Sequence, residues 1–313
     1  MKILIKPYIP FQEFDNSKYS GDDYFSGLLY ASIDNGSAES SEEFASPDTL
    51  LRRCKFSMEQ LRNIRDNMIY GMVHIAKKHG MLQHPVDIAI DAFDDPYYGD
   101  RSDIHVVGTK QKAGTNYAHS FLCADSIING ERFNLGFENK TIFTRDAELV
   151  ETLIRKISDM VDIRIVMMDK EFYQVRIVKM LYHNNLKFII PAPDTLGIMK
   201  IKHNNKHNLP IIVNYVMTSA TGDEVNVNLV LIKRKDQIHG FITNLDWDPE
   251  TIAEHYRNRW GIETNNRVRN DFSAMTTSRC YELRFLYYLM SVMLHNIWIF
   301  LNHLAILIWI IYA

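Results

Sequence analysis

The sequence predicts a three-layer α/β protein, and three observations lead to this prediction. Apolar and polar residues alternate in VDIAIDAF, which begins at Val86 and indicates a strand. Two further β segments lie between residues 116 and 143 and are joined at Asn129-Gly130, a dipeptide typical of hairpin turns. A helix, a strand, a helix and a strand then follow. The order is therefore three strands, a helix, a strand, a helix and a strand, which is an α/β arrangement.

The region before this sheet is predicted to be mostly helical. Residues 1 to about 50 show no clear element, and the acidic, serine-rich stretch 34–49 is typical of a loop. From about 48 to 80, apolar residues recur at the spacing of helix turns, which predicts one long helix.

The second half of the sheet is predicted to contain an insertion. Residues 194–240 are β-like on both sides of a turn at Gly222, which predicts a small β insertion. A further strand, 240–245, follows it. Asp248 then caps a helix that has Pro249 at its first position, and we expect this helix to carry residues 255–272.

The C-terminal segment is strongly apolar. Residues 285–313 contain no Asp, Glu, Lys or Arg and are long enough to span a bilayer. Two interpretations remain open: a membrane-spanning helix and the core helix of a soluble protein. Ser291, His295 and Asn302 fall on one side of a helix, and each would be costly in lipid. We therefore expect a buried core helix.

The composition is that of an ordinary globular protein. Hydrophobic residues make up 46% and charged residues 23% of the chain, and the formal net charge is −3. Because the chain has no general positive field, any binding of polyanions must use local patches. Cys54, Cys123 and Cys280 lie far apart, which indicates a reducing compartment and neither a disulfide framework nor a zinc site. The first residues lack the pattern of a signal peptide.

One stretch nevertheless gathers positive charge. HYRNRWGIETNNRVRNDF, residues 255–272, contains four arginines around a single glutamate. Four of its residues follow one another at steps of three, four and four and would share one face of a helix: Tyr256, Arg259, Glu263 and Arg267. A solvated, ion-paired helix surface would have the same spacing and remains an alternative. The apolar residues that flank the glutamate favour a partly buried face instead.

Three acidic residues could form a metal site. Asp91 is expected at the end of the first strand and Asp169 at the end of the fourth, and sites in α/β domains form at strand ends. With Glu263, they would make three carboxylates that repel one another unless a cation lies between them. Other acidic residues near the first strand are interpreted as residues of turns and caps: Asp87, Asp94, Asp95 and Asp100.

The ligand type indicates the cation and its chemistry. Carboxylate oxygens favour Mg²⁺ or Mn²⁺. Two such ions about 4 Å apart can activate an attacking oxygen and stabilise the leaving oxygen at a phosphodiester. The arginines around Glu263 would then hold the DNA phosphates that flank the cut, which explains why the positive charge is local.

These motifs resemble those of the DDE transposases of prokaryotic insertion sequences, in the RNase H-like superfamily. The resemblance is to the group with a Tyr-x2-Arg-x3-Glu-x6-Lys signature. Tyr256, Arg259 and Glu263 match this signature, and Asn270 stands at the position of the lysine. Arg267 or the arginine two residues after it could make the phosphate contact of that lysine.

The two aspartate motifs carry the rest of the resemblance, which covers roughly residues 48–310. IAIDAFDDPYYG resembles the strand that holds the first catalytic aspartate of such enzymes, which places it at Asp91. VMMDKEFY resembles the strand and turn of the second, which places it at Asp169 with Lys170 beside it.

The resemblance implies an RNase H-like fold, a mixed five-stranded sheet with helices on both faces, a small β insertion and an N-terminal helical region. The chain would then divide into four parts. Residues 1–84 would be an N-terminal region that could bind a DNA end, and 85–193 would be the first part of the catalytic domain. Residues 194–240 would be the β insertion, and 241–313 would be the second part of the catalytic domain with the apolar helix.

It also implies DNA cutting and joining. Metal-activated water would attack the phosphodiester at the transposon end, and the freed 3′-hydroxyl would attack the opposite strand or the target. The implied catalytic residues, which would bind two Mg²⁺ or Mn²⁺ ions, are Asp91, Asp169 and Glu263. The implied DNA contacts are Tyr256, Arg259, Arg267 and Lys170.

The implied partners are double-stranded DNA with terminal inverted repeats, target DNA, and a second copy of the chain in a homodimeric DNA complex. The expected location is the cytoplasm, at the nucleoid and away from the membrane. Two alternatives remain. One is an inactive or domesticated transposase-derived protein that only binds DNA, and the other is a membrane-associated protein with the C-terminal segment as its anchor.

Overall fold

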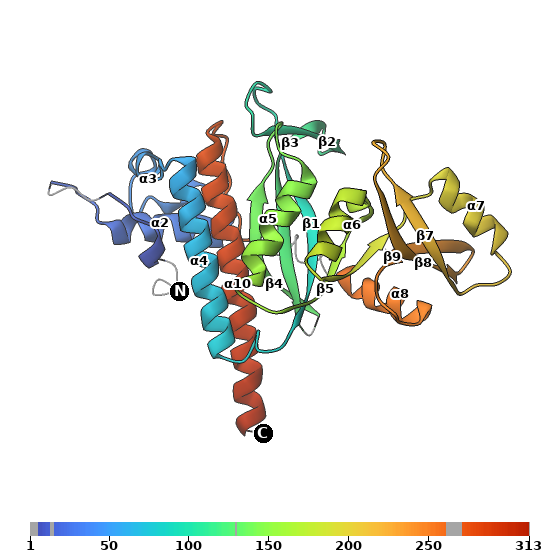
Figure 1. The fold of residues 1–313 in the computed structure, drawn as a ribbon. Coiled ribbons are helices and arrows are strands. Elements are labelled where there is room, and N and C mark those ends of the chain that lie inside the picture. The colour runs from blue at the N-terminus through green and yellow to red at the C-terminus, as the bar shows by residue number, and fades with distance from the viewer. Residues whose placement is uncertain (1–5, 13–15, 129, 261–270, 313) are drawn as a thin grey trace.

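The structure, a computed structural model, contains one mixed β-sheet flanked by helices (Figure 1). It describes residues 6–12, 16–128, 130–260 and 271–312 of the 313-residue chain. The strands are β1 (Val86–Pro96), β2 (Val106–Lys112), β3 (Thr115–Ile128), β4 (Glu131–Asn139), β5 (Ile163–Met168), β6 (Lys187–Pro191), β7 (Ile211–Thr218), β8 (Glu224–Arg234) and β9 (Gln237–Thr243). Within the described residues, these nine strands follow the order β2-β3-β1-β5-β6-β9-β8-β7, and β4 pairs with β3.

The centre of the sheet is parallel and its flanks are antiparallel. β1 pairs in parallel with β5, and β5 with β6. β3 runs antiparallel to β1 and also pairs with β2 and β4. β9 runs antiparallel to β6 and carries β8 and β7, so the insertion continues the main sheet. The mixed α/β sheet predicted from the sequence is confirmed, and β2 and β7 to β9 extend it beyond the five strands expected.

Helices cover both faces of the sheet. The α-helices are α2 (Gly21–Ile33), α3 (Pro47–Arg53), α4 (Met58–Lys78), α5 (Asp146–Ser158), α6 (Val175–His183), α7 (Leu196–Asn204), α8 (Pro249–Arg257) and α10 (Tyr281–Tyr312). Short 3-10 turns are η1 (Lys6–Tyr8), η2 (Ala38–Ser41), η3 (Lys170–Phe172) and η4 (Asn258–Trp260). Alternate residues of β5 divide between two cores. Val166 and Met168 pack in the core that includes α5 and α6, whereas Ile165 and Met167 pack in a smaller core with α8.

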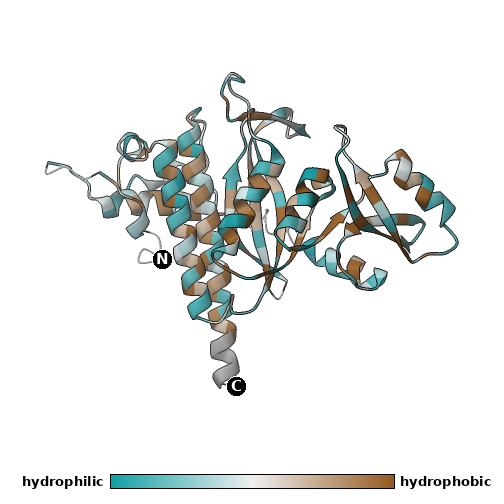
Figure 2. Cartoon of the chain, viewed as in Figure 1, coloured by the Kyte–Doolittle hydropathy of each residue, from teal (hydrophilic) through white to brown (hydrophobic). Residues whose placement is uncertain are grey.

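α10 is an apolar helix that is buried along most of its length. The part from Tyr281 to Ile306 is long and apolar enough to cross a membrane, but 61% of its apolar window is buried inside the protein. It packs beside α4 and against β4 (Figure 1), and it is mostly hydrophobic (Figure 2). Its Asn296 exchanges two hydrogen bonds with the backbone of Asn134 in β4, at 2.8 and 2.9 Å. The predicted core helix is therefore confirmed up to Phe300, beyond which more side chains are exposed.

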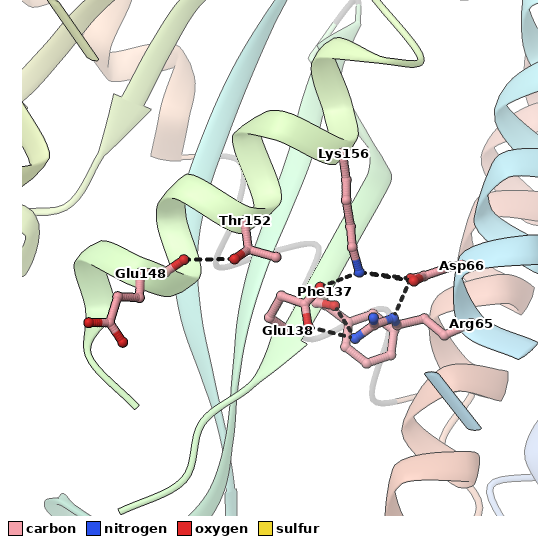
Figure 3. Close-up of polar contacts among 7 residues, drawn as sticks. All are labelled: Arg65, Asp66, Phe137, Glu138, Glu148, Thr152 and Lys156. Atoms are coloured by element: carbon pink, nitrogen blue, oxygen red, sulfur yellow. Dashed lines mark hydrogen bonds and ion pairs between the residues drawn. The ribbon is translucent and has the colours of Figure 1, made fainter. Parts of the chain in front are cut away.

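A partly buried polar network joins α4, β4 and α5 (Figure 3). The fully buried Arg65 donates to Asp66 at 2.7 Å, and to Glu138 and the Phe137 carbonyl at 2.9 Å each. Lys156 donates to Glu138 at 2.7 Å and to Asp66 at 2.9 Å. We call the four charged residues the α4 network. Its two cations and two carboxylates neutralise one another and attach the N-terminal helices to the sheet.

β1 is longer than predicted. The sequence suggested an end at Asp94-Asp95-Pro96, but β1 runs through these residues. The reason is the long partner strand β3. Its residues 118–120 pair with residues 94–96 and keep them in the strand. Asp91 therefore lies inside β1 instead of at its end. It still lies beyond the part of β1 that pairs with β5.

Other local predictions were wrong. The single helix expected over 48–80 is two helices, because Ser57 caps α4 in a reciprocal pair of hydrogen bonds with Gln60. The insertion contains the unexpected helix α7, which follows the capping residue Thr195. β2 was missed because it lacks an alternating apolar pattern.

Candidate active site

Asp91 and Asp169 lie on adjacent parallel strands. Ile90 of β1 is in register with Met168, the last residue of β5. The next residue in each case is an aspartate, so two carboxylates lie at the carboxyl end of this strand pair, where α/β sheets form their sites. Asp169 also caps the turn η3, and its side chain accepts a hydrogen bond from the backbone N–H of Lys170 at 2.7 Å. We call Asp91 and Asp169 the aspartate pair.

One guanidinium bridges the aspartate pair. Arg259 Nη1 lies 3.2 Å from Asp91 Oδ2, and Nη2 lies 3.7 Å from Asp169 Oδ1. Its Nε donates to the hydroxyl of Tyr256 at 2.8 Å, and that hydroxyl donates to the carbonyl oxygen of Met168 at 3.2 Å. The guanidinium also lies 5.2 Å from the centre of the Tyr256 ring. The end of α8 is thus attached to the end of β5 beside the two aspartates.

The aspartate pair carries more negative charge than its neighbours neutralise. Burial and the nearby carboxylate of Asp169 raise the pKa of Asp91 to about 6, although Arg259 opposes the rise. Burial also opposes the charge of Arg259, but the oxygens of Tyr256 and the aspartate pair outweigh burial and raise the pKa of Arg259. Among the described residues, two carboxylates therefore share one close cation, and a further positive charge would stabilise them.

This geometry lies within the part of the chain that matches a known family. A family model described as a transposase DDE domain matches residues 85–297, about two thirds of the 313-residue chain. The chain belongs to the DDE transposase family. A search of curated proteins finds no match. The mixed sheet of this transposase, flanked by helices, is consistent with the RNase H-like fold that the resemblance implied.

The described part of the transposase signature meets the aspartate pair. Tyr256 and Arg259 are brought to it through the contacts given above. Lys170 is exposed and follows Asp169 directly. Glu263 and Arg267 lie outside the described residues, as does the position of the signature lysine.

The helix that carries this signature is shorter than predicted. The sequence suggested one α-helix through 255–272, but α8 ends at Arg257 and the turn η4 follows it to Trp260. A tertiary contact accompanies this ending. The buried Arg132 of β4 donates from Nη2 to the carbonyl oxygen of Asn258, the C-cap residue of α8. A cation at the carbonyl end of a helix is favourable.

The aspartate pair fits a divalent cation as two of its ligands. Transposases of this family generally use divalent metals. Carboxylate oxygens are the ligands that Mg²⁺ prefers, and burial, followed by the nearby charge of Asp169, raises the pKa of Asp91 although Arg259 opposes the rise. The described residues contain no group of three or more potential ligands. The expected third carboxylate, Glu263, lies outside them.

Sequence reasoning missed a second charged group beside the site. Asp87 was interpreted as a residue of a turn or cap, which is wrong: it lies inside β1, is buried, and is paired with Arg164 and His255. A signal was present. In the alternating strand pattern, Asp87 falls on the same face as Asp91, four residues later.

Proposed function

We propose that this transposase cuts and joins DNA with Asp91, Asp169 and Glu263 as its catalytic carboxylates. The reaction is hydrolysis of a phosphodiester at a transposon end, followed by attack of the freed 3′-hydroxyl on the opposite strand or on target DNA. Membership of the DDE transposase family supports this class of reaction. The observation that supports the site best is the shared contact of Asp91 and Asp169 with one guanidinium, which requires the two carboxylates to lie close together.

The proposed cofactors are two Mg²⁺ or Mn²⁺ ions. When bound, such ions activate the attacking oxygen and stabilise the leaving oxygen of a phosphodiester. Asp91 and Asp169 would hold them together with Glu263. With the aspartate pair neutralised, Arg259 would be held less tightly by the carboxylates. Its guanidinium could then donate two parallel hydrogen bonds to a DNA phosphate.

The proposed DNA contacts are Tyr256, Arg259, Arg267 and Lys170. The exposure of Lys170 beside Asp169 supports its part in this set. Membership of the family implies that the transposase binds DNA. The proposed partners are double-stranded DNA with terminal inverted repeats, target DNA, and a second copy of the transposase in the DNA complex.

We also propose separate roles for different segments of the chain. Residues 1–84 would bind the DNA end, 85–193 and 241–313 would form the catalytic domain, and 194–240 would form the insertion. A transposase is expected to be soluble. We propose that it acts in the cytoplasm, at the nucleoid.

Cleavage of a short duplex that carries the element's own end tests the proposal. Asp169→Asn and Glu263→Gln keep the shape of each side chain and remove the charge that a hard cation needs. We expect both variants to lose Mg²⁺-dependent cleavage by about 10⁴-fold or more and still to bind the duplex. Asp100→Asn, at an exposed acid near the same strand, is the matched control and should cleave normally.

The outcomes separate the proposed function from its rivals. Full cleavage by either Asp169→Asn or Glu263→Gln would contradict the assignment of the catalytic residues. Binding of the duplex without any cleavage by the unmodified transposase would favour the inactive, DNA-binding descendant.

A further inference from the structure

We propose that Asp87 is a positioning residue for this reaction: its buried carboxylate, held by Arg164 and His255, determines where the end of α8 places Tyr256 and Arg259. The inference rests on the proposed function and adds to it a residue that does not touch DNA or metal.

Asp87 joins three elements of the fold. From β5, Arg164 donates from Nε to Asp87 Oδ1 and from Nη2 to Oδ2, both at 2.6 Å. From α8, His255 Nε2 lies 2.7 Å from Asp87 Oδ2. The Asp87 side chain is only 5% exposed, and both of its oxygens are engaged. Asp87 is therefore poorly placed to bind a substrate, and its contact with His255 links it directly to α8.

The charge of Asp87 is well stabilised. Burial by itself would raise the pKa of Asp87, but the hydrogen bonds from Arg164 and His255 outweigh burial and lower it. The imidazole of His255 also contacts an aromatic ring. The ring of Trp247 lies edge-on to it, with 5.3 Å between the ring centres. His255 is thus in contact with both an aromatic ring and a buried carboxylate.

Anchored residues and site residues alternate along the end of α8. His255 is bound to the sheet through Asp87, and three residues later the carbonyl oxygen of Asn258 accepts a hydrogen bond from Arg132. Tyr256 and Arg259 each follow an anchored residue directly, and both reach the end of β5. Residues three apart are neighbours on a helical turn. The end of α8 therefore has one anchored edge and, next to it, one edge that faces the aspartate pair.

This arrangement makes the position of Arg259 sensitive to the anchor. Its contacts with Asp91 and Tyr256 are 3.2 and 2.8 Å long, so a shift of about 1 Å would break them. A misplacement of about 1 Å at a catalytic site can lower the rate about 10²-fold. The anchor should therefore matter for the reaction more than for the stability of α8.

Four variants separate positioning from a merely structural role. His255→Leu removes the contact with Asp87, and His255→Gln keeps a side-chain N–H that can donate to it. Ile252→Ala is the matched control, because Ile252 is a fully buried apolar residue of the same helix whose side chain cannot hydrogen-bond to the anchor or to the site. It should cost about 2–4 kcal/mol of stability. Asp87→Leu removes the anchor from the other side.

Two readouts are measured on the full chain. The first is the ¹⁵N NMR signal of the Arg259 Nε–H, which the Tyr256 hydroxyl protects from exchange and which Arg259→Lys identifies. The second is the rate of cleavage at the DNA end, measured below the melting temperature of each variant. We expect His255→Leu to lose the protected signal and to cleave about 10- to 100-fold more slowly. His255→Gln and Ile252→Ala should keep the protected signal and the cleavage rate of the unmodified chain.

A double variant tests whether the changes at Asp87 and His255 act through the same contact. Combining Asp87→Leu with His255→Leu should slow cleavage no further than Asp87→Leu alone, because Asp87→Leu already removes the contact with His255. Survival of the protected Arg259 signal in His255→Leu would overturn the proposal. So would a loss of this signal in Ile252→Ala as large as the loss in His255→Leu. If the unmodified transposase does not cleave its own end, the proposed function fails, and the Arg259 signal alone then decides the positioning role.

Discussion

Two clusters of charge lie on this sheet, and they differ in balance. The α4 network contains two cations and two carboxylates, and its ion pairs are 2.7–2.9 Å long (Figure 3). The aspartate pair shares a single guanidinium, that of Arg259, at 3.2 and 3.7 Å. Both clusters link a helix to the sheet, but only the α4 network is electrically complete within the described residues.

The pKa values follow this difference. In the α4 network, burial would raise the pKa of Asp66, but hydrogen bonds from Arg65 and Lys156 outweigh it and lower the pKa. In the aspartate pair, burial dominates and raises the pKa of Asp91 to about 6. A balanced cluster serves to hold elements together. An unbalanced one is a candidate for binding a further charged species, and for this reason perturbed acids often mark functional sites.

The largest expected effect on stability is in the α4 network. Glu138→Gln removes one of its two negative charges and leaves the buried guanidinium of Arg65 poorly compensated. We expect the free energy of unfolding to fall by about 3 kcal/mol in urea denaturation at neutral pH. Asp91→Asn should instead leave it unchanged or raise it, because a disfavoured charge is lost. An equal fall in the free energy of unfolding in both variants would mean that the aspartate pair stabilises the fold as much as the α4 network does.

The next effect is a pH dependence with a defined sign. The pKa of Asp91 rises from 3.8 to about 6 on folding. Between about pH 4 and 6 the unfolded chain has released this proton and the folded chain has kept it. Asp91 therefore destabilises the fold progressively as the pH rises through this window, by roughly 3 kcal/mol in total.

Denaturation of the metal-free chain and of Asp91→Asn across this window measures the effect. The difference in free energy of unfolding, unmodified chain minus variant, should fall as the pH rises from about 4 to 6 and stay constant above. A difference in free energy of unfolding that does not change with pH would mean that folding does not disfavour the charge of Asp91.

The smallest effect concerns the arginine that the aspartate pair shares. Arg259→Ala should weaken binding of the DNA end and reduce the slope of log K against log salt by about 0.9, the value of one phosphate contact on duplex DNA. Lys187→Ala is the control, because Lys187 is an exposed cation at the opposite end of the parallel strands. An unchanged slope for Arg259→Ala in filter-binding assays would limit Arg259 to neutralising the aspartates.

The aspartate pair could be predicted from the sequence because its signal is local. Asp91 falls within a run of strand residues and Asp169 directly follows one, and parallel strands bring such positions to one edge. The spacing of three between Tyr256 and Arg259 was likewise enough to place them together. The mixed α/β sheet followed from the order of strand and helix patterns.

What could not be predicted depends on partners that are distant in sequence. Asp87 and His255 are 168 positions apart, and no periodicity relates them. The end of β1 was misplaced because its length is set by pairing with β3, which outweighs a local turn signal. The break before α4 was different: Ser57 and Gln60 formed a recognisable capping pair that the apolar periodicity obscured.

Binding of Mn²⁺ to the metal-free chain, measured by calorimetry without DNA, tests the role of the aspartate pair most directly. We expect the unmodified chain and the Asp100→Asn control to bind Mn²⁺ with the same affinity. Asp91→Asn and Asp169→Asn should each bind it at least about tenfold more weakly, because a carboxylate ligand is lost. Equal affinity in all four proteins would contradict the assignment of Asp91 and Asp169 as metal ligands.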